Sequence, residues 1–201
     1  MKLGFVGPAD GDRDLLREAL EFLVSDVAVD QAVYLGLDDL VDHVVDAWAA
    51  EIAGDASDRA FLDRAVGLAR EGSAAEIDEL LARDAAVERL GCIRKLPPAP
   101  ARAVEMVEDR FVTVVYDKSV LDEEDIANST LLVYGKAKEA QLRKFGPRYF
   151  FTPGPLRGGK IGVVEAESEG HVVVAVFAPS GAPLWRETLQ SRATTKVVVS
   201  S

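Results

Sequence analysis

Short apolar runs and amphipathic stretches alternate over the first third of the chain. Residues 3–6 are apolar and end at a Gly-Pro pair, which predicts a buried strand followed by a loop. Apolar residues then recur at helical spacing over residues 15–24, and Asp12 is placed to cap that helix. A second apolar run, residues 32–35, predicts another buried strand. The order strand, helix, strand predicts a parallel pair joined by a right-handed crossover.

The next segment is predicted to be helical. Residues 39–53 and 57–89 are rich in Ala, Asp, Glu and Arg, as expected for amphipathic helices with one solvated face. Gly72 and Ser73 divide the second region into two helices, because Ser73 and Glu76 have the spacing of a capping box. A proline-rich stretch then ends the helical block in an extended conformation.

Beyond residue 100 the pattern is typical of strands, several of them with alternating apolar and polar residues. Residues 103–107 and 111–116 flank a polar turn and predict a hairpin. Further strands are predicted at residues 131–134, 149–152, 161–165, 172–177 and 184–189, with a short helix at 123–127. The order predicts an α/β (α+β) chain that forms one domain, residues 1–201. In that domain two sheets are covered by helices, and the strands of the second half pair mostly antiparallel.

The protein is acidic, with a formal net charge of -11, which argues against general nucleic-acid binding. Basic residues gather in one later segment, namely Lys136, Lys138, Arg143, Lys144, Arg148, Arg157 and Lys160. No apolar run reaches the ~20 residues that span a bilayer, so no membrane association is expected. The single cysteine, Cys92, excludes an internal disulfide and is compatible with a reducing compartment, so we expect a cytoplasmic location.

Five segments, in order, resemble the calcineurin-like metallophosphoesterase superfamily in its small bacterial phosphodiesterase type. They are residues 1–12, residues 35–38 (Leu-Gly-Leu-Asp), residues 114–118 (Val-Val-Tyr-Asp-Lys), residues 132–138 (Leu-Val-Tyr-Gly-Lys-Ala-Lys) and residues 151–155 (Phe-Thr-Pro-Gly-Pro). The resemblance covers the chain apart from the helical block at about 55–89, which we interpret as an insertion. It implies a two-sheet β-sandwich flanked by helices.

The chemistry of that superfamily depends on two divalent metals, which are held by Asp, His and Asn side chains and activate a water. The resemblance places Pro8, Asp10, Leu37 (or Asp38, one residue on), Tyr116, Lys118, Lys136 and Lys138 at ligand positions. A Gly-Asn-His block would fall near residues 90–95, which contain neither Asn nor His. The two histidines, His43 and His171, lie outside every matched segment. We therefore expect a degenerate site without a metal or any other cofactor.

Three interpretations of the lysines stay open. In the first, they form ion pairs that take the place of the metals, because unpaired acids in a cleft are costly; the acids would be Asp10, Asp12 and Asp38. In the second, a pocket binds a small anion such as phosphate or a nucleotide through Lys118, Lys136 and Lys138, together with Arg94 or Lys95. In the third, the lysines project into solvent.

The expected function is that of a non-catalytic pseudoenzyme that acts as a protein-binding scaffold or regulator, and the superfamily includes a scaffold of a membrane-trafficking coat. The first alternative is a sensor of an anion or nucleotide. The second is a phosphoesterase with a rebuilt site, in which Asp10, Asp38 and Asp39 bind a single Mg²⁺. Partner proteins are expected and nucleic acid is not, and enzymatic activity is left open.

Overall fold

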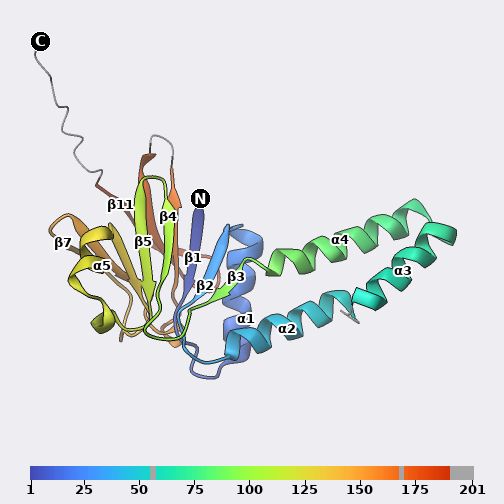
Figure 1. Ribbon diagram of the computed structural model, residues 1–201, viewed down its shortest axis with the longest axis horizontal. Coiled ribbons are helices and arrows are strands. Elements are labelled where there is room, and N and C mark those ends of the chain that lie inside the picture. The colour runs from blue at the N-terminus through green and yellow to red at the C-terminus, as the bar shows by residue number, and fades with distance from the viewer. Residues whose placement is uncertain (55–57, 168–169, 191–201) are drawn as a thin grey trace, which may run out of the picture.

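A computed structural model of the chain describes residues 1–54, 58–167 and 170–190 (Figure 1). Its centre is a sandwich of two sheets, and the first sheet has six strands in the order β11-β10-β9-β1-β2-β3. These strands are β1 Lys2–Val6, β2 Gln31–Tyr34, β3 Ile93–Lys95, β9 Ile161–Ala166, β10 Val172–Phe177 and β11 Pro183–Leu189. Strands β1, β2 and β3 are parallel, which confirms the predicted opening strand, helix and strand.

The second sheet has five strands in the order β4-β5-β6-β8-β7. They are β4 Ala103–Val107, β5 Arg110–Val115, β6 Leu131–Tyr134, β7 Gln141–Phe145 and β8 Arg148–Thr152. Most pairs in the second half of the chain are antiparallel, as predicted, but β5, β6 and β8 are parallel to one another. Between β5 and β6 the chain returns through helix α5, Glu123–Asn128, and such a crossover allows parallel pairing.

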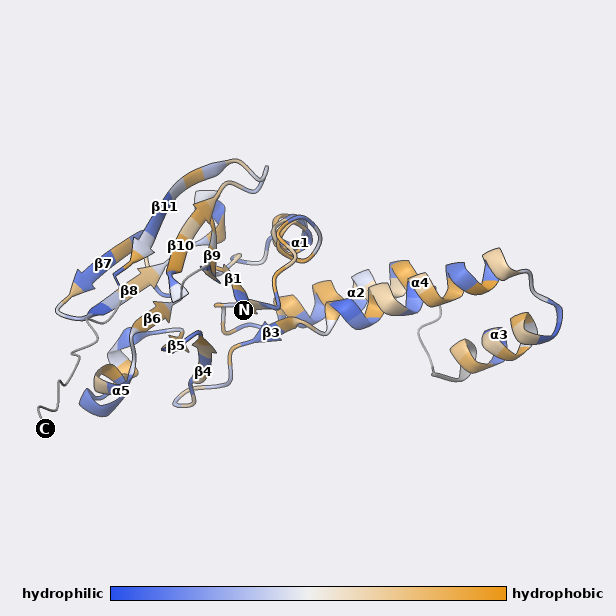
Figure 2. Cartoon of the chain, turned by 90° about the horizontal axis from the view of Figure 1, so that it is seen from above, coloured by the Kyte–Doolittle hydropathy of each residue, from blue (hydrophilic) through white to orange (hydrophobic). Residues whose placement is uncertain are grey.

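Helices cover the sandwich on both outer faces. Helix α1, Arg13–Glu21, continues into a π-helical turn at Phe22–Asp26 and lies against the first sheet, whereas α5 lies outside the second sheet (Figure 2). The Asp12 side chain accepts a hydrogen bond from the Leu15 amide at 3.1 Å, so Asp12 is the N-cap predicted for α1. The predicted sandwich flanked by helices is confirmed.

The apolar residues separate into two cores that share the first sheet. One core lies between this sheet and the helices; it includes Val6, Leu16, Leu20, Leu23, Val44 and Trp48. The other fills the space between the two sheets, and it includes Phe5, Leu35, Val114, Val133, Phe151 and Val174. Because side chains alternate across a strand, β1 supplies Val6 to the first core and Phe5 to the second.

Three helices form an arm that projects away from the sandwich (Figure 1). They are α2 Leu40–Ala53, α3 Asp58–Glu71 and α4 Ala74–Leu90, and we call residues 40–90 the arm. Ser73 caps α4 in the capping box that its spacing with Glu76 predicted, with the Ser73 amide donating to Glu76 Oε2 at 2.8 Å. No helix in the described residues is long and apolar enough to cross a membrane.

Two glycines let the sheets approach closely where β1 and β6 end. A Cβ atom added to Gly7, after β1, would overlap the carbonyl oxygen of Gly154, after β8. A Cβ added to Gly135, after β6, would overlap the carbonyl oxygen of Leu35, after β2. Both overlaps are with backbone atoms that side-chain rotation cannot relieve, so these contacts require glycine.

We predict that Gly7→Ala lowers the free energy of unfolding by about 2 kcal/mol or more, because the methyl group forces the ends of β1 and β8 apart. Urea denaturation would measure this change. Gly158→Ala is the matched control, because a Cβ at that position meets nothing within 4 Å. Equal unfolding midpoints for the two variants would contradict this account of the strand ends.

Candidate functional site

The positions that the resemblance singled out all lie in loops at one end of the sandwich. Pro8 and Asp10 follow β1, and Leu37 and Asp38 follow β2 in the first sheet. In the second sheet, Tyr116 and Lys118 follow β5, and Lys136 and Lys138 follow β6. The contacts of Gly7 with Gly154 and of Gly135 with Leu35 bring these loops together, and we call them the strand-end site.

Tyr34 joins two loops of the strand-end site. Its side chain is fully buried at the end of β2, and its hydroxyl donates to Asp38 Oδ1 at 3.0 Å. The same hydroxyl accepts a hydrogen bond from the Ala9 amide at 3.3 Å. Burial raises the pKa of Tyr34 well above its usual value, and the neighbouring Asp38 carboxylate raises it further, so the hydroxyl keeps its proton.

Asp38 is held as a structural acceptor. Besides the Tyr34 hydroxyl, its carboxylate accepts a hydrogen bond from the amide of Leu40 at 3.1 Å, at the start of α2. The sequence pattern indicated Asp38 as a partner of lysine or Mg²⁺ and gave no role in the site to Tyr34. The available signal was a tyrosine at the end of a buried strand, because a buried hydroxyl requires a hydrogen-bond partner.

An ion pair joins the two loops of the second sheet. Lys136 Nζ lies 2.5 Å from Asp117 Oδ2, and the Ser119 amide donates to Asp117 Oδ1 at 3.0 Å. These donors lower the pKa of Asp117 to about 2, with the Lys136 ammonium as the larger cause, and Asp117 raises the pKa of Lys136 in turn. Lys118 lies over the ring of Tyr134, with Nζ 4.8 Å from its centroid. Two of the three lysines therefore have partners within the protein.

The other predicted positions are less tightly held. Lys138, Asp10 and Leu37 are exposed, and no acid lies within ion-pair distance of Lys138 among the residues that the structure describes. The Asp10 carbonyl oxygen accepts a hydrogen bond from Arg157 at 3.2 Å. Pro8 is half-buried and accepts one from the Leu156 amide at 2.9 Å. The predicted pairing of the lysines with Asp10, Asp12 and Asp38 does not occur; Asp117 is the acid that Lys136 binds.

Beside the strand-end site, Lys95 at the end of β3 bridges two acids at the start of α2. Its Nζ lies 2.5 Å from Asp39 Oδ1 and 2.6 Å from Asp42 Oδ2, and this contact lowers the pKa of Asp39. Arg94 is exposed within β3 itself and forms no ion pair in the described part of the chain. Residues 90–95, where a Gly-Asn-His block would fall, lie at the end of α4 and along β3. The residue that follows β3, Leu96, is buried.

The strand-end side chains do not fit a pair of divalent cations. Proline and leucine have no ligating atom, and an ammonium group coordinates a cation only after losing its proton. Asp38 and Asp117 already accept hydrogen bonds from Tyr34 and Lys136. Within residues 1–54, 58–167 and 170–190, no group of three or more His, Cys, Asp and Glu side chains is placed to hold a metal ion.

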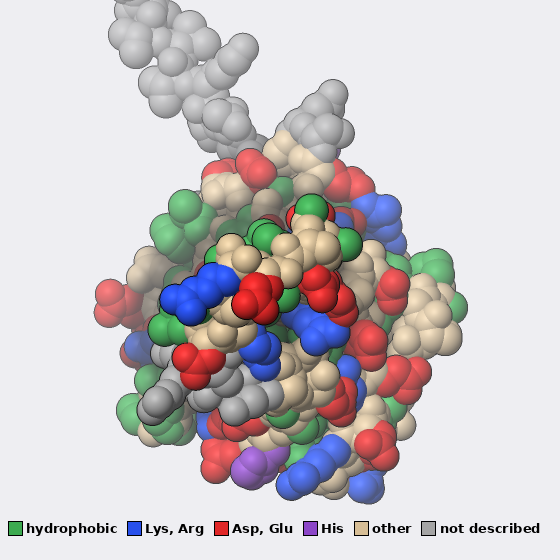
Figure 3. Space-filling view, turned by 90° about the vertical axis from the view of Figure 1, so that its right-hand side faces the viewer, with side chains coloured by type: hydrophobic (Ala, Val, Ile, Leu, Met, Phe, Trp, Pro, Cys, Tyr) green, Lys and Arg blue, Asp and Glu red, His purple; other side chains and the backbone are tan. Residues whose placement is uncertain are grey.

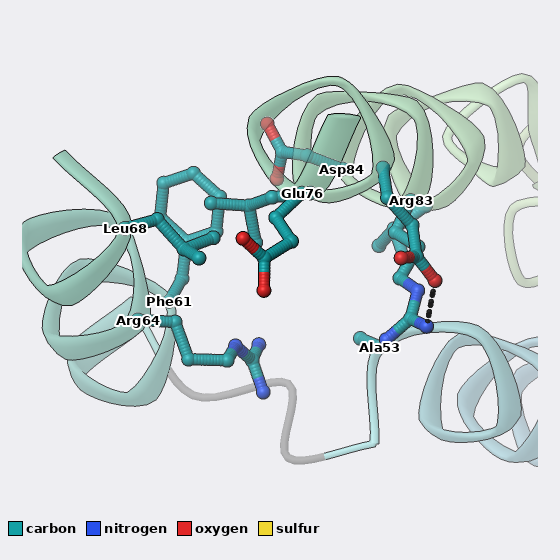
Figure 4. A pocket seen from close by; sticks show the side chains of 10 residues that line it. Ala53, Phe61, Arg64, Leu68, Glu76, Arg83 and Asp84 are labelled. Atoms are coloured by element: carbon teal, nitrogen blue, oxygen red, sulfur yellow. Dashed lines mark hydrogen bonds and ion pairs between the residues drawn. The ribbon is translucent and has the colours of Figure 1, made fainter. Parts of the chain in front are cut away.

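The arm contains a cavity of about 340 Å³ between its helices. Its walls are Ala53, Phe61, Arg64, Leu68, Glu76, Glu79, Leu80, Arg83, Asp84 and Val87. Figure 4 shows Phe61 and Leu68 on α3 opposite Glu76 on α4, with Arg83 of α4 on the other side near Ala53. Arg83 is paired with Glu79. The helices of the arm therefore pack incompletely at this level.

Comparison with known proteins gives a likeness of structure only. No protein-family model matches the sequence, and no curated protein matches it. Vacuolar protein sorting 29 from Cryptosporidium parvum is similar in structure, with a TM-score of 0.54, 11% identity, and coverage of 94% of this chain and 98% of that one. A conserved, uncharacterized predicted phosphoesterase from Streptococcus pneumoniae TIGR4 has a TM-score of 0.52, 12% identity, and coverage of 96% and 99%.

These two likenesses span almost the full length of all three chains. At 11–12% identity they establish the fold alone: the chain has the calcineurin-like metallophosphoesterase fold, as the resemblance implied.

We predict that Lys136→Met raises the pKa of Asp117 from about 2 toward its ordinary value of 3.8, because the ammonium that holds the carboxylate ionised is removed. The pKa in the folded protein lies below the unfolded value. The pair therefore stabilises the fold above pH 3.8, and this contribution disappears as the pH falls through about 2. A carboxyl-carbon NMR titration would measure the shift. Lys138→Met should leave the Asp117 titration unchanged, and a shift of the same size in that variant would refute the assignment.

Proposed function

We propose that this protein, built on the calcineurin-like metallophosphoesterase fold, is a non-catalytic scaffold that binds other proteins. One observation carries the proposal: the acids Asp38 and Asp117 at the strand ends are bound by other side chains of the protein and do not form a set of metal ligands. Asp38 is bound by Tyr34, and Lys136 is bound by Asp117. These contacts support a structural use of this end of the fold.

The arm supports the proposal that this protein binds other proteins. It extends sideways from the sandwich rather than across the ends of β1 and β2, so it does not close over the strand-end site (Figure 1). Four large apolar side chains of α3 and α4 are exposed on it. A protein that presents such residues on a projecting element gains by burying them against a partner, at about 25 cal/mol per Å² of apolar surface.

An anion-binding sensor is the alternative that one observation favours. Lys138 is exposed without an ion-pair partner among the described residues, and Lys118 is held only by the ring of Tyr134. These two ammonium groups remain available to a phosphate. A rise in Tm with inorganic phosphate that disappears in Lys118→Glu with Lys138→Glu would support this alternative over the scaffold.

We predict no hydrolysis of bis(p-nitrophenyl) phosphate above the metal-buffer blank, with Mg²⁺ or Mn²⁺ added, because the strand-end side chains do not form a ligand set. Release of p-nitrophenolate measures the rate. The Asp38→Ala variant tests whether any metal-dependent activity uses the Asp38 carboxylate as a ligand of a single metal ion. Metal-dependent turnover that is lost in Asp38→Ala would overturn the non-catalytic proposal and establish an enzyme that uses this carboxylate.

We predict that the tagged full-length protein, purified from its own organism after mild cross-linking, retains one or more proteins in stoichiometric amount. Quantitative mass spectrometry would measure the retention. An unrelated tagged protein with a similar net charge controls for capture by charge alone. The scaffold proposal fails if the two baits retain the same proteins in the same amounts.

A further inference from the structure

The arm carries two short apolar stripes that no other part of the described chain covers. On α3 the stripe consists of Leu62 and Val66, with 59% and 52% of their surface exposed. On α4 it consists of Ile77 and Leu81, which are 37% and 55% exposed. In each helix the two residues are four apart, so they lie one above the other on a single face.

The two stripes lie on the same side of the helix pair. Leu62 directly follows Phe61, which lines the arm cavity, and Ile77 and Leu81 directly follow Glu76 and Leu80, which line it from α4. One residue turns a helix by about 100°. Because α3 and α4 run antiparallel (Figure 1), this step rotates the side chains of both helices away from the shared interior toward the same side. The four residues therefore form one apolar surface, which we call the arm face.

Unneutralised acids border the arm face. Asp63 follows Leu62 and Asp78 follows Ile77, while Glu88, seven residues beyond Leu81, returns to the same side of α4. These three carboxylates are exposed and have no ion-pair partner among the residues that the structure describes. In Figure 3, which faces the free end of the arm, acidic side chains lie beside hydrophobic ones, with basic side chains among them.

Arg70, four residues beyond Val66, is a basic residue on the same side of α3, but the arm as a whole is acidic. Residues 40–90 contain 12 acidic and 5 basic residues, a net charge of -7 out of the -11 of the whole chain. A negative potential of this kind attracts a basic partner and speeds its association. It opposes the approach of a second copy of the arm, which brings the same charge, and that of an anionic membrane surface.

We propose that the arm face binds a basic amphipathic helix of a partner protein. This inference rests on the proposed scaffold function and adds the surface and the chemistry of the partner. The apolar stripe of the partner helix packs between Leu62 and Val66 on one side and Ile77 and Leu81 on the other. Its Lys and Arg side chains meet the bordering carboxylates, as in the binding of amphipathic helices to apolar grooves.

The size of the surface agrees with a helix as the bound element. Helix α3 has 14 residues and is therefore about 21 Å long. A partner helix lying along the arm face would make contact over about four turns, which requires anchors at positions i, i+3 or i+4, and i+7. The contact is small beside a standard interface of about 800 Å² per partner, so moderate affinity is expected.

The test uses the full-length protein and synthetic peptides of about 18 residues, long enough for five helical turns. The probe peptide has Leu at helical spacing on one face and Lys or Arg elsewhere. One control peptide has the same composition with Leu spread around the helix, and the other has Glu in place of Lys and Arg. We expect only the probe peptide to bind in fluorescence anisotropy, with an affinity that falls as the salt concentration rises.

Leu62→Gln with Leu81→Gln should weaken binding of the probe peptide about tenfold or more, because it removes two central apolar contacts. Glutamine keeps the helix propensity close to that of leucine, and circular dichroism would verify the helical content. Val120→Gln with Leu184→Gln, at exposed apolar positions on the sandwich, is the matched control and should bind like the parent. Asp78→Asn with Glu88→Gln should weaken binding and flatten its salt dependence without changing any apolar contact.

Several results would overturn the inference: equal binding of both basic peptides, binding of the acidic peptide, or full binding by the Leu62→Gln with Leu81→Gln variant. Dimerisation that depends on the arm, measured by light scattering, would assign the face to a second copy instead. The scaffold proposal is judged separately. If the wild type and this variant retain the same cellular proteins, the scaffold stands and the arm inference falls. If neither retains any, the scaffold itself falls.

Discussion

The close approach of the two sheets at their strand ends is the contact on which the rest of the site depends. Gly7 lies against the backbone of Gly154, and Gly135 lies against that of Leu35. Only residues without a Cβ allow this spacing. Because these contacts fix the ends of β1 and β6, the loops after four different strands begin at the same place. This packing positions the loops after β1, β2 and β6, and the loop after β5 is tied to them by the Lys136 amide, which donates to the Tyr116 carbonyl oxygen at 2.7 Å.

Once the loops are held together, their polar groups must find partners. Asp38 and the buried Tyr34 satisfy each other, and the Tyr34 hydroxyl also satisfies the Ala9 amide. Across the second sheet, Asp117 and Lys136 form the corresponding pair. The pairs differ in environment: Tyr34 is buried, so the loss of its hydrogen bonds is costly. The exposed ion pair between Asp117 and Lys136 contributes little to stability and mainly sets the protonation of its acid.

The space between the two sheets and the space between the helices of the arm differ in how completely side chains fill them. The space between the two sheets is filled by fully buried side chains such as Phe5, Phe151 and Val174. The arm, in contrast, has a cavity among its helices and leaves four apolar residues of α3 and α4 exposed. The cavity and the exposed apolar residues of α3 and α4 are the features on which the proposed contact with a partner rests.

The sequence by itself determined the local elements, because apolar periodicity and caps act within a few residues of one another. It predicted the helices of the arm, the capping box at Ser73 and most strands, and it missed the three-residue β3 and the charged edge strand β7, whose patterns are short or polar. It also located the positions of the strand-end site through their order along the chain. Only the tertiary structure decided which acid each lysine meets, since Asp117 and Lys136 are 19 residues apart and join only when β5 and β6 pair. The same holds for the arm face, whose two stripes reach one side because α3 and α4 fold back on each other. Contacts of this kind depend on the relative placement of whole elements, which no local pattern contains.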